Sequence, residues 1–248
     1  MNKTIGLYNC DKKSGKTVSA VYLAESFATL GFKILLIEAD PKNSLSAFLG
    51  LKTSQSTLTF QDLFREDTQK DITVYKPNSA SWSCIPYASA HSGQGLYQDE
   101  NNLDVQKLEK IRAQFDYVFI DFPSRTYQTP NALFKSVDSV IVPVESEYFG
   151  LDTLDKTFEC LITIQDVLIE GILLNRFDAN NSFSPTLLAK MKEIFSDLVF
   201  ESIIPRNYYL GLPDCSFEAL LNKTTHFGVA DYLKLANEII EKQSVTES

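Results

Sequence analysis

The first seventeen residues constrain the fold more than any other stretch of the chain. An apolar run of strand type, residues 4–8, leads into the loop 9–17, which ends in Gly-Lys-Thr, and a helical pattern of apolar residues begins at Val18. A buried strand that turns tightly into a helix directs backbone N–H groups and the positive end of the helix dipole at an anion. The stretch therefore predicts a phosphate-binding loop at the start of an α/β fold.

Two side chains of this loop carry the predicted chemistry. In a Walker A loop, Gly-x-x-x-x-Gly-Lys-Thr, the lysine reaches the β- and γ-phosphates and the threonine hydroxyl binds Mg²⁺. Here these residues are Lys16 and Thr17, while Cys10 stands in place of the first glycine. A thiol beside a helix N-terminus can have a lowered pKa, which we expect for Cys10. The alternative interpretation is an ordinary strand-to-helix turn with a solvated lysine.

Composition limits the remaining possibilities. The 248 residues, 44% hydrophobic and 22% charged, suit one α/β domain over residues 1–248 that buries its own core. No apolar stretch approaches the ~20 residues of a membrane span and no signal peptide is recognisable, so we expect a soluble, cytoplasmic protein without membrane attachment. Four scattered cysteines indicate neither a zinc site nor a disulfide framework. A net charge of −9 disfavours a broad basic surface for nucleic acid, although a local patch stays open.

Apolar runs of strand length alternate with helical patterns along the chain. The predicted strands after the first are residues 33–40, 71–76, 82–86, 116–123, 139–144, 170–176 and a short edge strand over 198–204. The predicted helices are residues 18–30, 60–64, 103–115, 151–169, 187–195 and 229–240, and residues 89–95 are a predicted loop. Near-continuous apolar strands are typical of a parallel sheet covered on both faces. The sequence therefore predicts an α/β fold, a three-layer, doubly wound and mostly parallel sheet.

Polar residues end several of these strands. Glu38 and Asp40 lie at the end of one strand, Asp121 at the end of another and Asn175 at the end of a third. The carboxyl ends of parallel strands meet at the edge where ligands bind, so we expect these side chains near the phosphate-binding loop. Asp121 fits a Walker B carboxylate beside Mg²⁺, or alternatively an aspartate that only forms the turn before Pro123. The amide of Asn175 suits an adenine base, because it can donate and accept together, or is a turn asparagine.

Several segments together resemble the ParA/Soj branch of the ParA–MinD family of deviant-Walker P-loop ATPases. The segments are residues 9–17, like the family's Asn-x-Lys-Gly-Gly-x-Gly-Lys-Thr; 38–43 followed by Leu49-Gly50, like Asp-x-Asp-Pro-Gln; 116–124, like Asp-Tyr-x-x-Ile-Asp-x-Pro-Pro; 143–151; and 204–207 followed by Leu210 and Pro213. Their order and spacing hold from end to end. The resemblance therefore covers nearly the whole chain.

This resemblance implies cofactors, partners and site residues. It implies ATP and Mg²⁺, a face-to-face homodimer around two ATP molecules that dissociates after hydrolysis, a ParB-like or other stimulating partner, and movement of DNA or another cargo. The implied catalytic residues are Asp40, which positions the attacking water, and Lys16. The implied nucleotide-binding residues are Asp11, Lys12, Lys13, Ser14, Gly15, Lys16, Thr17, Val18, Asn175, Pro205 and Arg206, and the implied metal ligands are Thr17, Asp40 and Asp121.

The chain departs from the family pattern in the loop. The signature lysine, which reaches across the dimer to the partner's nucleotide, falls on Asp11, and the two glycines fall on Lys12 and Lys13. A carboxylate aimed at a γ-phosphate is repelled, so Asp11 cannot take that role. Lys12 or Lys13 can do so only if the loop is re-aimed, and a side chain there removes the backbone freedom of glycine. In the Walker B segment, Ser124 replaces the second proline.

Three functions follow as hypotheses. The first is a ParA-like ATPase of low activity that partitions or positions a plasmid, chromosome or other cargo; the second is a degenerate relative that binds ATP, scarcely hydrolyses it and acts as a scaffold or regulator. The third is a small-molecule enzyme of the dethiobiotin-synthetase kind, against which segments 143–151 and 204–207 argue. Residues 201–248 hold four basic and seven acidic side chains, so we expect weak DNA binding or binding through an adaptor.

Overall fold

The computed structural model describes residues 2–51, 58–64, 76, 80–87, 105–124, 131–146, 151–164, 167–206 and 229–246. The predicted loop 89–95 and, apart from Lys76, the predicted strand 71–76 lie outside these ranges. Asn207, Leu210 and Pro213 lie outside them as well.

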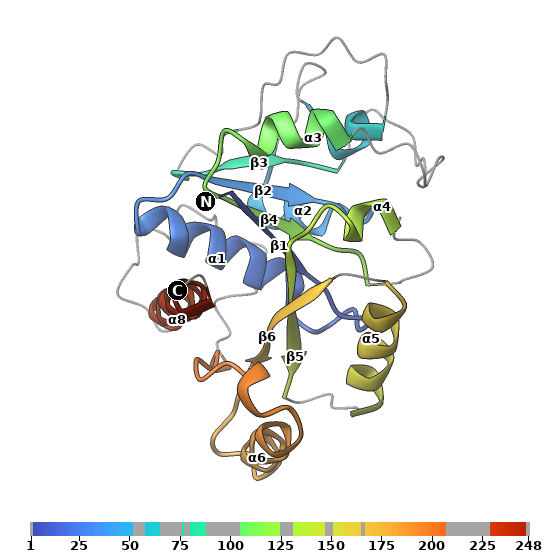
Figure 1. The fold of residues 1–248 in the computed structure, drawn as a ribbon. Helices are drawn as coiled ribbons and strands as arrows, with labels where there is room; N and C mark the ends of the chain where they lie inside the picture. Colours follow the sequence, from blue (N-terminus) through green and yellow to red (C-terminus); the bar gives the residue numbers. More distant parts are fainter. Residues whose placement is uncertain are drawn as a thin grey trace.

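A six-stranded parallel sheet forms the centre of the fold (Figure 1). The strands are β1 (Lys3–Leu7), β2 (Ile34–Glu38), β3 (Ser83–Ile85), β4 (Tyr117–Asp121), β5 (Ser139–Glu145) and β6 (Leu168–Asn175). Their order is β3-β2-β4-β1-β5-β6, and every pairing is parallel. The register sets Asp121 beside both Leu7 and Glu38. The ends of β1, β2 and β4 therefore meet at one edge, as the apolar runs predicted.

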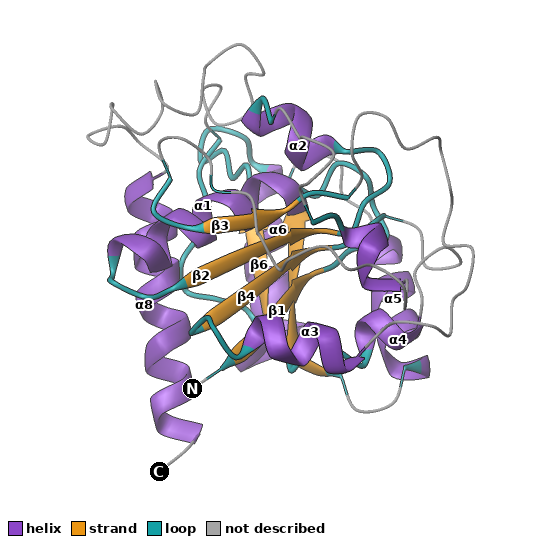
Figure 2. Ribbon diagram, turned by 90° about the horizontal axis from the view of Figure 1, so that it is seen from above, coloured by secondary structure: helices purple, strands orange, loops and turns teal. Residues whose placement is uncertain are grey.

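Helices cover both faces of this sheet and complete three layers. They are α1 (Lys16–Thr29), α2 (Ser44–Leu49), α3 (Val105–Arg112), α4 (Asn131–Phe134), α5 (Leu151–Thr163), α6 (Phe183–Phe195) and α8 (Val229–Thr246), with 3-10 turns η1 (Phe60–Phe64) and η3 (Ser196–Leu198). One apolar core joins the sheet to α1 and α8, and the other joins it to α3, α4, α5 and α6. Figure 2 shows α1 and α8 on one side of the strands and α3, α4 and α5 on the other. The predicted doubly wound fold is confirmed.

Helix α1, which follows the phosphate-binding loop, is packed between the sheet and α8. Its residues are apolar around most of the helix because α8 covers the side that the sheet leaves open, and the rings of Tyr22 and Tyr232 stack at 5.3 Å. Gly31, with a φ of 94°, ends the helix in the left-handed conformation that glycine tolerates. None of the helices in the described ranges is long and apolar enough to cross a membrane.

Several predicted boundaries and one predicted strand are wrong. Helix α5 ends at Thr163, and Ile169 belongs to β6, which pairs with β5 from Leu168 onward. The predicted edge strand 198–204 does not form, and only isolated bridges join Val199 and Pro205 to the chain at β6. The backbone N–H groups of residues 201 and 202 donate to the carboxylate of Glu238 on α8, both at 2.8 Å, so they are unavailable to a strand ladder. Helix α6 begins four residues before its predicted start, at Phe183.

Candidate functional site

The loop between β1 and α1 is held by the side chain of Asn9. Its Oδ1 accepts a hydrogen bond from the N–H of Asp11 at 2.7 Å, and its Nδ2 donates to the carbonyl of Pro143 in β5 at 2.8 Å. The N–H of Cys10 donates to the hydroxyl of Thr157 on α5 at 3.2 Å. Sequence reasoning assigned no role to Asn9, although its position directly after an apolar strand was the available signal. These bonds anchor the entry of the loop to the next strand and the facing helix.

The three substituted positions of the loop take ordinary conformations. The carboxylate of Asp11 accepts the N–H of Lys13 at 3.0 Å, so it folds back onto its own loop. Lys12 and Lys13 are exposed, and neither has a positive φ. Only Gly15 within the loop has a positive φ, 86°, and a Cβ atom there would lie 2.7 Å from Nδ2 of Asn175. The fold therefore requires glycine at position 15 and accommodates lysine at the two positions before Ser14.

The ammonium group of Lys16 lies inside a ring of oxygen atoms. Nζ donates to the carbonyls of Asn9 at 3.1 Å and Asp11 at 2.6 Å, and to the hydroxyls of Ser124 at 3.1 Å and Ser14 at 3.4 Å. An ammonium has three protons, so four acceptors share them. Ser124 thus contacts Lys16 from the end of β4, a role that sequence reasoning did not assign. Burial lowers the pKa of Lys16 to about 8, against the attraction of nearby carboxylates, of which Asp121 acts most strongly.

Thr17 and Asp121 face each other beside this lysine. The Thr17 hydroxyl donates to Oδ2 of Asp121 at 2.8 Å, whereas Oδ1 of Asp121 is buried and has no hydrogen-bond partner in the structure. Burial raises the pKa of Asp121 to about 7, although its bond to Thr17 and the charge of Lys16 act in the opposite direction. A hydroxyl and an unpaired carboxylate oxygen are the hard donors that Mg²⁺ prefers. These two side chains therefore fit a magnesium ion.

The buried carboxylate of Asp121 predicts a measurable gain in stability when its charge is removed. Its pKa is raised on folding, so the folded state holds the proton more tightly, and this contribution is lost as pH rises through about 7. Asp121→Asn should therefore match the parent near pH 4 and exceed its free energy of unfolding by on the order of 2–4 kcal/mol at pH 8. Urea unfolding without nucleotide, followed by the emission of the single tryptophan, Trp82, measures this difference. A difference that does not change with pH would contradict the argument.

The two carboxylates after β2 take different roles. Glu38 is fully buried and accepts from the N–H groups of Leu45 at 2.8 Å, Ser46 at 3.0 Å and Tyr87 at 3.1 Å, and from the Ser46 hydroxyl. Glu38 therefore fixes the start of α2. Its strand ends at the ligand-binding edge of the sheet as predicted, but its carboxylate is bonded to α2. Asp40 is 9% exposed, and its Oδ1 accepts the N–H of residue 42 at 3.0 Å. The N–H of Ala39 donates to the carbonyl of Asp121 at 3.0 Å, so Asp40 follows directly after a residue bonded to the end of β4. The charge of Asp40 acts on both Lys16 and Asp121.

Asn175 contacts the phosphate-binding loop directly. Its Nδ2 donates to the carbonyl of Ser14 at 3.0 Å and to the hydroxyl of Ser19 at 3.1 Å. Both N–H bonds are used, so the amide cannot donate and accept toward a base as expected. Its Oδ1 remains buried without a partner and can only accept. Pro205 and Arg206 are exposed and lie near the end of β6, where the N–H of Arg206 donates to the carbonyl of residue 177 at 2.8 Å.

The expectation of a lowered pKa for Cys10 is wrong. Burial raises the pKa of this thiol, and its bonds to the hydroxyls of Tyr8, at 3.4 Å, and Thr157 only oppose that rise. Cys10 packs against the apolar core, and the loss of water there is the largest cause of the rise. Val18, which the resemblance assigned to the nucleotide, packs against the core that α1 shares with α8. The structure thus brings Lys16, Thr17, Asp40, Asp121 and Asn175 together and uses Cys10 and Val18 in packing.

The arrangement defines a class of protein. A parallel sheet with a Gly-Lys-Thr loop between its β1 strand and a helix, and with an aspartate at the end of the neighbouring strand, characterises P-loop nucleotide-binding proteins. A family profile described as an AAA domain matches residues 2–173. The chain belongs to the ParA/Soj branch of the ParA–MinD family of P-loop ATPases.

Individual relatives cover almost the full chain. The sporulation initiation inhibitor protein Soj of Bacillus subtilis is 29% identical, over 96% of this chain and 98% of its own length. The chromosome partitioning protein ParA of Caulobacter vibrioides is 30% identical, over 92% of this chain and 90% of its own. Among solved structures, the septum site-determining protein MinD of Pyrococcus horikoshii, complexed with Mg-ADP, has a TM-score of 0.79 at 19% identity, over 99% of this chain and 98% of its own.

Proposed function

We propose that the protein is a ParA-like ATPase. In this proposal one domain over residues 1–248 binds ATP and Mg²⁺, dimerises on ATP, and helps to partition or position a plasmid, chromosome or other cargo in the cytoplasm. One observation carries it: the buried ammonium of Lys16, surrounded by loop oxygens at the start of α1, lies beside the Thr17–Asp121 pair. The names of the relatives, partition proteins among them, support the biological role.

Each residue has a distinct task in this proposal. Lys16 holds the β- and γ-phosphates, and Thr17 and Asp121 hold Mg²⁺, which when bound neutralises charge on the phosphate oxygens. Asp40 accepts a hydrogen bond from the attacking water and orients it in line with the γ-phosphate. Oδ1 of Asn175 accepts from the exocyclic amino group of adenine, which guanine lacks at that position, so the site favours ATP over GTP.

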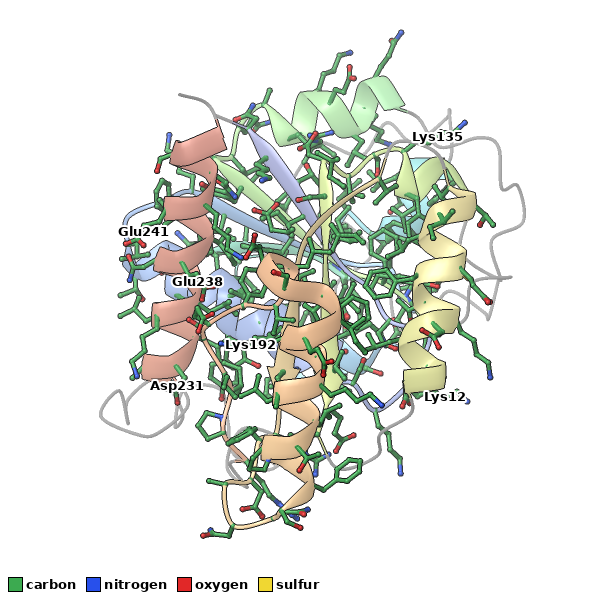
Figure 3. All side chains as sticks on the ribbon, turned by 60° about the horizontal axis from the view of Figure 1, so that its bottom comes forward. Lys12, Lys135, Lys192, Asp231, Glu238 and Glu241 are labelled. Carbon is green, nitrogen blue, oxygen red and sulfur yellow. The ribbon has the colours of Figure 1, made fainter. Side chains whose placement is uncertain are left out.

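The dimer contact across the nucleotide falls to Lys12 or Lys13 in place of the signature lysine. Both side chains are exposed on the loop, and Figure 3 shows Lys12 at the surface beside α5. Asp11 is excluded because its carboxylate is bonded to its own loop.

One observation favours a second candidate function. Because Asp11 replaces the signature lysine, the chain also suits a degenerate relative that binds ATP with little hydrolysis and acts as a scaffold or regulator. The two candidates share nucleotide binding and differ in turnover. A single-turnover ATP hydrolysis assay, with and without duplex DNA, separates them.

The C-terminal third of the chain offers little positive charge for direct binding to DNA. Three lysines in the C-terminal third form ion pairs: Lys192 with Glu201 at 2.6 Å, Lys234 with Asp231 at 3.3 Å and Lys242 with Glu238 at 3.9 Å. Figure 3 shows acidic side chains along α8 and Lys192 on the neighbouring α6. Such pairing lowers the positive potential that phosphates require. We therefore propose that cargo is reached through an adaptor or through weak DNA contacts.

Sedimentation velocity tests the proposal and its DNA arm together. With ATP and Mg²⁺ the protein should sediment as a dimer, and with ADP or without nucleotide as a monomer. Duplex DNA added to the ATP form should co-sediment at low salt and dissociate well below ~0.2 M salt, since few counterions are released. A monomer in saturating ATP would contradict the proposal. Tight DNA binding at ~0.2 M salt would contradict the adaptor proposal and support direct binding to the nucleoid.

A further inference from the structure

A buried hydrogen-bond chain joins the phosphate-binding loop to the C-terminal helix. The carbonyl of Ser14 accepts from Nδ2 of Asn175 at 3.0 Å, and the same Nδ2 donates to Oγ of Ser19 at 3.1 Å. Oγ of Ser19 lies 2.9 Å from the hydroxyl of Tyr232 in α8. The chain therefore crosses four elements: the loop, the end of β6, the first turns of α1, and α8.

Water cannot replace these bonds. The exposed fractions of Ser14, Asn175, Ser19 and Tyr232 are 1%, 3%, 0% and 1%. A polar group left unpaired at such depth keeps its full desolvation cost, so each member of the chain restricts the orientation of the next. The amide of Asn175 also contacts the loop at Gly15, where a Cβ atom would lie 2.7 Å from Nδ2.

We propose that Tyr232 is a positioning residue for the nucleotide site, a proposal that rests on the proposed function. Its hydroxyl orients Ser19, Ser19 orients the amide of Asn175, and the amide holds the carbonyl of Ser14, two residues before Lys16. The same orientation of the amide fixes Oδ1 of Asn175, which is buried without a hydrogen-bond partner. The position of α8 is thereby transmitted to Asn175 and to the phosphate-binding loop.

The packing of α8 supports this transmission. The ring of Tyr232 stacks on that of Tyr22 in α1 at 5.3 Å and 13°, and α8 buries three further residues in the core that it shares with α1. The carboxylate of Glu238 accepts the backbone N–H groups of residues 201 and 202, in the segment between η3 and Arg206, and the N–H of Ile204 in this segment donates to the carbonyl of Leu174 in β6. Helix α8 is thus bonded on one side to the helix of the loop and on the other to the chain beside Asn175.

Tyr232→Phe tests the proposal because it removes one hydroxyl and keeps the stacked ring. ATP affinity, measured by calorimetry on the full chain with Mg²⁺, should fall about threefold to tenfold, as expected for one buried hydrogen bond. Tyr22→Phe is the matched control, since it removes the same group from the other ring of the stack, and none of the three bonds of the Ser14–Tyr232 chain uses that hydroxyl. Its ATP affinity should stay within about twofold of the parent.

A double-mutant cycle separates positioning from simple stabilisation. Ser19→Ala should weaken ATP binding at least as much as Tyr232→Phe, and the double variant should be no weaker than Ser19→Ala alone, because both act through one chain. Unfolding in urea, followed by Trp82, verifies that each variant is folded, and Ser19→Ala tests the chain if Tyr232→Phe is not. Additive effects, or parental affinity in Tyr232→Phe, would overturn the proposal. Failure of the parent itself to bind ATP would overturn the proposed function instead.

Discussion

Lys16→Ala is expected to weaken ATP binding by about tenfold to a hundredfold, the effect of losing one charge-assisted contact of roughly 1.5–3 kcal/mol. Lys16 is 5% exposed, and its ammonium is held by three oxygens of the loop and by the hydroxyl of Ser124, so no neighbouring lysine can take its place in the same geometry. Isothermal titration calorimetry with ATP and Mg²⁺ measures the loss. Lys16→Gln, which is one atom shorter and keeps a neutral donor group, should be intermediate.

Lys33→Ala is the matched control for this experiment. Lys33 is exposed at the opposite end of β2, so its loss should leave ATP affinity within about twofold. Equal affinities in the parent and in Lys16→Ala would show that the loop does not bind phosphate.

The same lysine gives ATP binding a pH dependence of predictable sign. Burial lowers the pKa of Lys16 to about 8, and a polyanion binds the charged form. The affinity of the parent should therefore fall as pH rises above about 8. The affinity of Lys16→Ala should be nearly flat over the same range.

Asp40→Ala is expected to retain ATP and lose turnover by about a hundredfold or more, the usual contribution of a group that handles the attacking water. Asp40 follows Ala39, whose N–H donates to the carbonyl of Asp121, and its Oδ1 accepts the N–H of residue 42, so its carboxylate is preorganised. Because Lys16, Thr17 and Asp121 hold the nucleotide and Mg²⁺ in this proposal, the variant should still bind ATP and accumulate as the ATP-bound dimer. Phosphate release and sedimentation with ATP and Mg²⁺ measure the two effects.

Asp40→Asn distinguishes the charge of this residue from its support of the loop. The amide oxygen can still accept the N–H of residue 42, so the loop should keep its shape while turnover is lost. Asp116→Asn is the matched control, because Asp116 also accepts a backbone N–H, that of Lys33, but at the far end of the sheet. Parental turnover in Asp40→Asn would move the catalytic role to another residue.

Most of the fold could be predicted from local pattern. Continuous apolar runs located the six strands of the sheet, since a parallel strand covered on both faces must be apolar throughout. The boundaries failed where long-range contacts decide: α5 ends at Thr163 because β6 pairs with β5 from Leu168, and residues 201–202 give their N–H groups to Glu238. Neither contact can be recognised from the sequence around these residues.

The sequence by itself determined which ends of which strands meet. The sequence shows where each apolar strand ends, and in a parallel sheet the carboxyl ends of the strands lie at the same edge. Lys16, Thr17 and Asp121 come together for this reason. Only the tertiary structure decided what the side chains at that edge contact.

Three residues illustrate the difference. Glu38 turns to α2, the amide of Asn175 turns to the phosphate-binding loop, and burial raises the pKa of Cys10 where its sequence position predicts a lower one. For Glu38 and Asn175 the deciding partner lies on an element separate from the residue's own strand, and burial makes that contact costly to leave unmade. For Cys10 the deciding factor is burial itself. Hydrogen-bond partners and desolvation are therefore properties of the packed chain.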